Sequence, residues 1–296
     1  MARTDAIVLG AGIVGTSIAL QLVKRGMSVA LIDRGGVGEE TSYGNSGVIE
    51  GSTIMPPAFP PGLAAVMKVG LKQASEANFH WSYLPKVAPW LLAFRANSRP
   101  DRIEENARAN RPLFARAIAE HDVLMLESGA TRYLRRNGWV KLYRSEAAFE
   151  ALRPDLALAR EFGVPYEALD AAGAKKLEPS LNPVFKRAVF WPGVVSLSNP
   201  LAVTKAYAAR FAALGGVALK GDARSLHRSD GRWRVDTSEG PVDAPTAVVA
   251  LGPWAPEVLE PLNIHLPLEV KRGYHMHFSA EGNKGLNRPV LDAEVG

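Results

Sequence analysis

The sequence predicts an α/β fold made of two domains that are interleaved along the chain. Residues 6–9 form a short apolar run that stops at a glycine, which is typical of a buried parallel strand. Residues 13–25 follow with apolar side chains at helical spacing and stop before Gly26, and residues 28–32 are a second apolar run. Strand, helix and strand in about thirty residues predict a right-handed βαβ unit.

The chain then leaves this unit. Residues 34–54 are rich in Gly, Ser, Thr and Asn and lack periodicity, and the prolines at 56, 57, 60 and 61 indicate a crossover into another domain. Apolar spacing there predicts a mainly helical region, a strand and a further helix. The expected helices cover 63–75, 83–96, 103–128 and 146–162, and the expected strand covers 138–144.

The later sequence returns to the first domain. Asn199 and Pro200 begin a helix over 201–214, and a run of short strands follows. The expected strands cover 217–219, 223–227, 233–237 and 247–251, and 268–278 is the last extended segment. We therefore expect one domain from 1–55 plus 196–255 and a second, α+β domain from 56–195 plus 256–296.

Composition excludes several classes of function. The chain has 296 residues and no cysteine, which excludes disulfides, Cys-ligated metal sites and a thiol nucleophile within it. The net charge is +5, but basic residues alternate with acids, as at residues 102–105, so we expect no nucleic-acid binding. No run approaches the roughly 18 apolar residues of a spanning helix, and no signal peptide is recognisable, so a cytoplasmic protein is expected. The six histidines are scattered, and we expect no metal site, not even at His275 and His277.

One motif carries chemistry. Gly10-Ala11-Gly12-Ile13-Val14-Gly15 is a GxGxxG sequence that follows the first strand and opens the helix, and Asp33 ends the second strand. The first glycine permits a tight turn, the second lets the backbone approach a pyrophosphate, and the third allows helix and strand to pack closely. The helix N-terminus favours phosphate charge, and the Asp33 carboxylate accepts from ribose hydroxyls. The motif predicts a Rossmann-like site for the ADP half of a dinucleotide.

The fingerprint does not decide between NAD and FAD, because enzymes of both kinds share it. The next segment, Glu40-Thr41-Ser42-Tyr43-Gly44-Asn45-Ser46-Gly47, combines hydroxyls with glycines. Such a segment can donate hydrogen bonds to a pyrophosphate and a ribityl chain while a flat ring lies close to its glycines. A flexible surface loop is the alternative.

Four segments together resemble the FAD-dependent D-amino acid oxidase superfamily, and within it the bacterial D-amino acid dehydrogenases of small-subunit type. They are residues 10–15, 41–47, 250–254 (Ala-Leu-Gly-Pro-Trp) and 271–274 (Lys-Arg-Gly-Tyr), with lesser agreement at 176–181 and at Asn199-Pro200. The resemblance covers the whole chain in order. It implies FAD as cofactor, an FAD-binding domain in the first position and a substrate domain in the second.

The resemblance also assigns roles to residues. The ADP moiety would be held by Gly10, Gly12, Ile13, Val14, Gly15, Asp33 and Arg34. The path from pyrophosphate to flavin would be lined by Thr41, Ser42, Asn45, Ser46 and Gly47, while Ala223, in a strand, would touch the adenine region and Gly252 and Trp254 the second passage along the cofactor. Tyr274 would face the flavin from a strand as the candidate catalytic residue, with His275 as the alternative and a half-buried strand tyrosine as the plain structural explanation.

The implied reaction is oxidative deamination of a D-amino acid, with hydride transfer to the flavin and hydrolysis of the imino acid to a 2-oxo acid and ammonia. Oxygen or a membrane quinone would be the electron acceptor, and a quinone implies peripheral association with the inner membrane. Three alternatives stay open: a sarcosine, glycine, proline or opine substrate; an NAD-dependent dehydrogenase; and an inactive fragment that binds FAD poorly. Residues 291–296 end without a polar tail, and family members have a further C-terminal segment, so we expect a C-terminally truncated chain.

Overall fold

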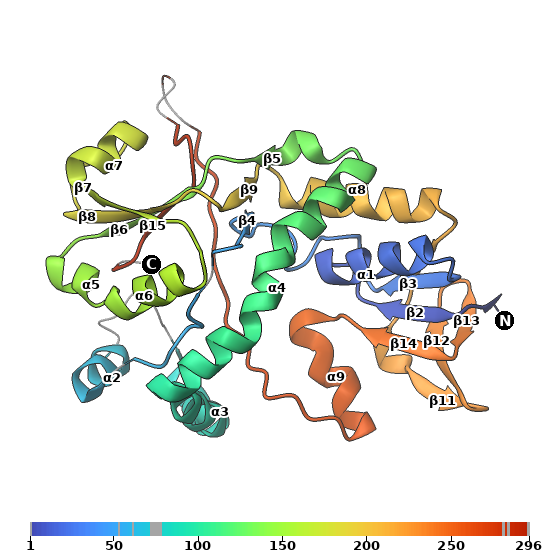
Figure 1. Ribbon diagram of the computed structural model, residues 1–296. Coiled ribbons are helices and arrows are strands. Elements are labelled where there is room, and N and C mark those ends of the chain that lie inside the picture. Colours follow the sequence, from blue (N-terminus) through green and yellow to red (C-terminus); the bar gives the residue numbers. More distant parts are fainter. Residues whose placement is uncertain are drawn as a thin grey trace. The chain divides into compact units, whose positions relative to one another are not determined.

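The computed structural model of the chain describes residues 2–52, 54–60, 62–71, 79–279, 282 and 285–294. The chain forms two compact units, each built from three separate segments (Figure 1). The first unit consists of Met1–Gly47, Glu120–Leu134 and Leu197–His275, and the second of Val48–Ala119, Arg135–Ser196 and Met276–Gly296. Relative to the expected domain bounds, this division groups 120–134 and 256–275 with the first unit, and 48–55 and 196 with the second.

A parallel four-stranded sheet forms the centre of the first unit. Its order is β10 (Val217–Lys220), β3 (Val29–Asp33), β2 (Ala6–Leu9) and β14 (Thr246–Val249). All four residues of β2 are fully buried, which explains their continuous apolar run. Helices α1 (Ile13–Lys24) and α8 (Pro200–Ala213) pack side by side on this sheet (Figure 1). The predicted α/β class with a βαβ unit is confirmed.

A second sheet packs on the first within the same unit. Its strands lie in the order β1 (Ala2–Arg3), β13 (Gly240–Ala244), β12 (Arg232–Thr237) and β11 (His227–Ser229). Ile7, Leu9 and Ile32 of the parallel sheet share one apolar core with Val235 and Val242 of the second. This core fixes the later β strands against the N-terminal βαβ unit, although the two are far apart in sequence.

The second unit is an α+β layer structure. Its sheet has the order β15 (Val290–Asp292), β6 (Trp139–Tyr143), β8 (Arg187–Trp191) and β7 (Glu167–Asp170). β8 pairs antiparallel with β6 and β7, and β15 pairs parallel with β6. One face of β6 and β8 packs on α5 (Glu146–Glu150) and α6 (Arg153–Glu161), and the other packs on α7 (Ala171–Leu177). The remaining elements of the chain are β4 (Val48–Ile49), β5 (Leu134–Arg135), β9 (Val195–Leu197), α2 (Gly62–Gly70), α3 (Leu84–Asn97), α4 (Pro100–Glu127) and α9 (Ala255–Leu259), with 3₁₀ turns at Trp81–Tyr83, Thr131–Tyr133, Ala223–Ser225, Gly252–Trp254 and Glu260–Leu262.

A buried carboxylate ties the last strand of the second unit to its sheet. Glu178 is fully buried and accepts hydrogen bonds from the backbone N–H of Asn287 at 2.8 Å and from its side-chain amide at 3.1 Å. At the other end of β15, Asp292 accepts from Nε of Arg144 at 2.7 Å. A buried carboxylate needs such donors, because burying it unpaired would be costly. These contacts give the 176–181 segment a structural role.

Several expected elements differ from the structure. The helix over 146–162 is two helices, because α6 starts anew at Arg153 with Pro154 in its first turn. The helix over 63–75 ends at Gly70, and residues 72–75 lie outside the described residues. The extended segment expected over 268–278 is not part of a sheet, since residues 264–279 belong to no helix or strand. The expected strand over 223–227 is wrong at its start, where Asp222 accepts a hydrogen bond from the N–H of Arg224 and forms a turn instead.

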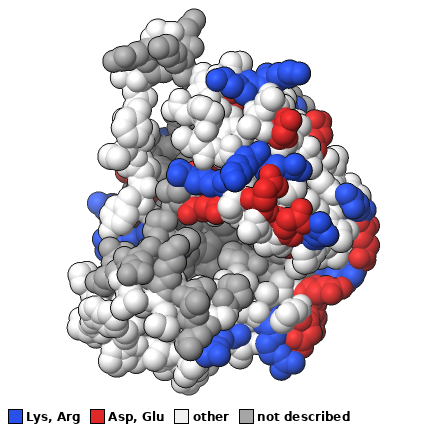
Figure 2. All heavy atoms as spheres, turned by 90° about the vertical axis from the view of Figure 1, so that its left-hand side faces the viewer, with Lys and Arg blue, Asp and Glu red and all other residues white. Residues whose placement is uncertain are grey.

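Surface charge is mixed. Figure 2 shows Lys and Arg side chains next to Asp and Glu on the face it presents. Arg108, for example, pairs with both Glu104 and Glu161. Within the described ranges, no helix combines the length and the apolar character needed to cross a bilayer.

We predict that His121 makes the unfolding free energy depend on pH. His121 is half-buried, its Nδ1 lies 3.0 Å from the hydroxyl of Tyr207, and burial lowers its pKa. As pH falls below the ordinary histidine pKa of about 6.5, the unfolded chain takes up a proton that the folded chain resists. The contribution of His121 to the unfolding free energy should therefore be complete above about pH 6.5 and should be lost as the pH falls towards the lowered pKa of the folded state.

Chemical denaturation at pH 7.5 and pH 5.5 measures this effect. His121→Gln should lose less unfolding free energy between the two pH values than the wild type, while the exposed His265→Gln should match the wild type. Equal acid sensitivity in His121→Gln and wild type would contradict the assignment.

Candidate functional site

A cavity of about 260 Å³ lies in the first unit, at the carboxyl ends of its parallel strands. Gly10 follows β2, Asp33 ends β3, Gly221 follows β10, and Ala250 follows β14, and all four residues line the cavity. In open parallel sheets this edge is where ligands bind. The cavity is therefore the candidate functional site.

The glycines of the fingerprint allow two close approaches of backbone. Gly10 has φ +102°, and a Cβ there would overlap the carbonyl oxygen of Ala250. A Cβ on Gly15 would overlap the carbonyl oxygen of Gly10, so α1 lies directly on the turn. At Gly12 a Cβ would meet only the hydroxyl of Ser42, at 3.2 Å. Gly10 and Gly15 are thus required by the fold, whereas Gly12 keeps the cavity open.

The start of α1 points donors at the site. Gly12 is the N-cap residue and offers no side chain, so the N–H of Ile13 donates instead to the hydroxyl of Ser42 at 2.8 Å. The positive end of the helix dipole lies at the same place, and no acidic residue occupies the first turn of α1. This arrangement suits a bound anion, with the Ser42 hydroxyl hydrogen as a further donor.

Asp33 is held by the backbone on both carboxylate oxygens. Its Oδ2 accepts from the N–H of Ala11 at 2.7 Å, and its Oδ1 accepts from the N–H of Gly35 at 2.8 Å. Each oxygen has a second lone pair that can accept a hydroxyl proton. The carboxylate is therefore fixed in place and still able to bind ribose.

One charged and one aromatic side chain, Arg34 and Trp254, form part of the cavity wall. The guanidinium carbon of Arg34 lies 4.7 Å from the ring centroid of Trp254, within the range of a cation–π contact. Arg34 also pairs with Glu40 at 3.6 Å. Gly252 begins the 3₁₀ turn that carries Trp254 to the cavity.

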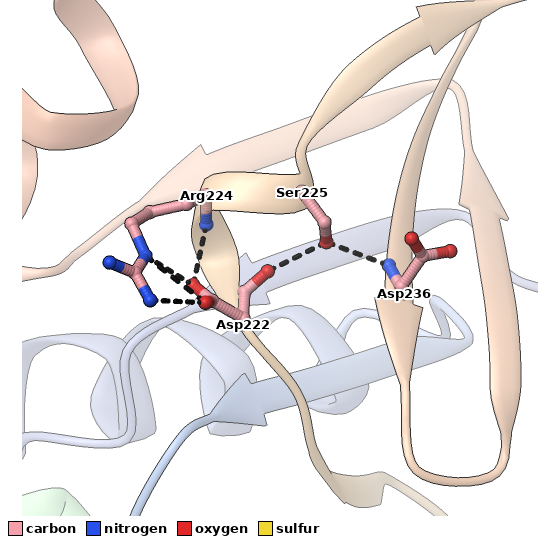
Figure 3. A network of polar contacts seen from close by, with 4 residues as sticks. All are labelled: Asp222, Arg224, Ser225 and Asp236. Carbon is pink, nitrogen blue, oxygen red and sulfur yellow. Dashed lines mark hydrogen bonds and ion pairs between the residues drawn. The ribbon is translucent and has the colours of Figure 1, made fainter.

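A compact polar network forms another part of the wall (Figure 3). Asp222 accepts from Nε and Nη2 of Arg224, and this pairing lowers the pKa of the Asp222 carboxyl. The hydroxyl of Ser225 donates to the carbonyl of Asp222 at 2.7 Å and accepts from the N–H of Asp236 at 2.9 Å. The network ties the turn to β12 and presents Ala223 to the cavity.

The segment after Asp33 reaches the cavity only in part. Thr41 and Ser42 line it, whereas Asn45, Ser46 and Gly47 do not. Asn45 instead stabilises the segment, because its Oδ1 accepts from the N–H of Gly47 at 2.8 Å. The carbonyl of Gly47 accepts from the N–H of Leu197 at 2.7 Å, which fixes the end of the segment.

Most of the predicted cofactor residues converge on this cavity, and the candidate catalytic residue does not. Its lining includes Gly10, Gly12, Ile13, Val14, Asp33, Arg34, Thr41, Ser42, Ala223, Gly252 and Trp254, and Gly15 lies directly behind Gly10. Tyr274 does not line the cavity, and its side chain is 92% exposed. The cavity is also lined by three residues that were not predicted, because their sequence patterns are those of ordinary surface residues: Asp222, Arg224 and Glu257. The described residues contain no cluster of three His, Asp or Glu side chains that could share a metal ion.

Comparisons with known proteins give a consistent family. The family described as FAD dependent oxidoreductase (DAO) matches residues 5–295. A D-amino-acid oxidase of Bradyrhizobium diazoefficiens is 31% identical over 91% of this chain and 65% of its own length. A D-amino acid dehydrogenase of Rhizobium johnstonii is 31% identical over 97% of this chain and 70% of its own length.

Solved structures share the fold. Glycine oxidase from Geobacillus kaustophilus superposes with a TM-score of 0.64 at 21% identity, covering 90% of this chain and 60% of the oxidase. L-amino acid deaminase from Proteus vulgaris gives a TM-score of 0.63 at 19% identity, covering 89% of this chain and 51% of the deaminase. The chain thus spans about two thirds of the first curated relative and about half to three fifths of these structures.

The two kinds of glycine should respond differently to substitution. We expect Gly12→Ala to weaken FAD binding about tenfold with little change in unfolding free energy, because its methyl group faces the cavity and meets only the Ser42 hydroxyl. Gly15→Ala should weaken binding and also lower the unfolding free energy by about 1–3 kcal/mol, because its methyl group overlaps backbone. FAD titration and urea denaturation of both variants measure this, and equal stability losses would contradict the distinction.

Proposed function

The chain belongs to the DAO family of FAD-dependent oxidoreductases, and from this premise we propose that its cavity holds the ADP part of FAD and that it oxidises a D-amino acid. FAD as cofactor follows from the family, which sets the NAD-dependent alternative aside. The positions of the cofactor atoms and the identity of the substrate are our proposal.

One observation carries the cofactor assignment. The glycine turn, the donor at the start of α1 and the doubly held Asp33 carboxylate meet in one cavity. In the proposed complex, the N-terminal N–H groups of α1 and the Ser42 hydroxyl would donate to the pyrophosphate, and Asp33 would accept from ribose. Arg34, Trp254 and Ala223 would form the wall near the adenine. The residues present therefore fit the group.

The proposed reaction is oxidative deamination. Bound FAD supplies a two-electron acceptor, so the protein needs to bind and orient the substrate more than to transfer protons. The amino acid loses a hydride from its α-carbon, and water hydrolyses the imino acid to a 2-oxo acid and ammonia. D-amino acids are favoured because relatives named as D-amino acid oxidase and dehydrogenase are about 31% identical over nine tenths or more of this chain.

Substrates of the same class are the rivals, among them glycine, sarcosine, proline and opines. Glycine oxidase and L-amino acid deaminase share the fold, but identities of 19–21% carry no substrate to this chain. Tyr274 as catalytic residue, a quinone as electron acceptor and association with a membrane remain predictions from the resemblance.

Anaerobic spectroscopy of the purified chain tests the proposal. After addition of FAD, a bound flavin band should appear in the visible spectrum, and D-alanine should bleach it while L-alanine should not. Bleaching by glycine or sarcosine but not by D-alanine would transfer the assignment to a rival substrate. Failure to retain FAD would contradict the cofactor site itself.

A further inference from the structure

His275 lies against the segment that follows the cofactor's phosphate site. Its ring meets Tyr43 edge-on, with the ring centroids 5.6 Å apart and the planes at 90°. The same ring covers Gly44 so closely that a Cβ on this glycine would overlap the imidazole Cε1, Nδ1 and Nε2 atoms. Both contacts lie within the first unit.

Gly44 adopts a backbone conformation that few other residues can take. It has φ +72°, in the left-handed region that favours glycine. Other points of the segment have backbone or internal partners: Ser42 binds the N–H of Ile13, Asn45 binds the N–H of Gly47, and Gly47 binds Leu197. Between these points, the N–H of Tyr43 donates to the carbonyl of Glu40 at 3.0 Å, and the His275 ring packs on Tyr43 and Gly44.

We propose that His275 is a positioning residue for the cofactor: its imidazole packs on Tyr43 and Gly44 and fixes the part of the segment that leads from the pyrophosphate towards the flavin. This inference rests on the proposed function, which places Ser42 against the pyrophosphate of the cofactor. It also separates the two neighbours in the sequence, since Tyr274 is 92% exposed, whereas His275, itself at the surface, contacts the segment.

We expect loss of the His275 ring to change the affinities for ADP and FAD differently. Because Ser42 is held independently at the start of α1, loss of the His275 ring should leave the ADP site in place. ADP affinity should therefore stay within twofold of the wild type in His275→Ala. FAD affinity should fall about tenfold, because the flavin-side part of the segment is no longer fixed.

Titration of the apoprotein with FAD and, separately, with ADP tests the inference. The variants are His275→Ala, His275→Phe, which keeps a flat ring, and His265→Ala, an exposed histidine of the same stretch. His275→Phe should recover most of the FAD affinity, and His265→Ala should bind like the wild type. Equal losses for FAD and ADP in His275→Ala, or no loss of either, would overturn the positioning role.

A double-variant cycle tests the contact itself. Gly44→Ala should weaken FAD binding, both because alanine disfavours a positive φ and because its methyl group displaces the ring. In the double variant, Gly44→Ala with His275→Ala, there is no ring for the new methyl group to displace. The fold-loss of FAD affinity should therefore be smaller than the product of the losses in the two single variants. Strictly multiplicative losses would show that the two residues do not touch. If the wild type itself failed to bind FAD while remaining folded, the proposed function would fall and this inference with it.

Discussion

The close approach of backbone at Gly10 is the constraint on which the site depends. Only a residue without a side chain fits between the end of β2 and the carbonyl of Ala250 after β14, and Gly15 brings α1 directly onto the same turn. The parallel strands β2, β3 and β14 have their carboxyl ends at one edge of the sheet, so the turn, Asp33 and Ala250 share one cavity. The apolar core formed with Val235 and Val242 keeps the later strands in this register.

Much of the first unit was predictable from local sequence patterns. Continuous apolar runs gave the buried strands, and the GxGxxG spacing with Asp33 gave the turn, because each position has its own steric or hydrogen-bonding requirement. The predicted resemblance to the D-amino acid oxidase superfamily is confirmed by the family match over residues 5–295. Asn199 begins α8 as expected, accepting from the N–H of Ala202 at 3.0 Å.

The errors have a common origin in interactions that sequence spacing does not reveal. Residues 268–278 alternate in part, yet no strand forms there, and the apolar side chains of Leu268, Val270 and Tyr274 are exposed. Ala223 lies in a turn because Asp222, Arg224 and Ser225 hydrogen-bond locally, which competes with extended backbone. Residues 120–134, which include the last part of α4, group with the first unit, and helical periodicity alone cannot assign a helix to one domain or the other.

The central claim is that the cavity beside β2, β3 and β14 holds the adenosine part of FAD. Trp254 lines this cavity and stacks with Arg34, so its fluorescence reports occupancy directly. Titration of the wild type and of Trp254→Phe with FAD and with NAD, followed by tryptophan emission, tests the claim. The account predicts saturable quenching by FAD, a smaller signal in Trp254→Phe and no saturation with NAD. Quenching by FAD that is identical in Trp254→Phe, or tighter binding of NAD than of FAD, would contradict it.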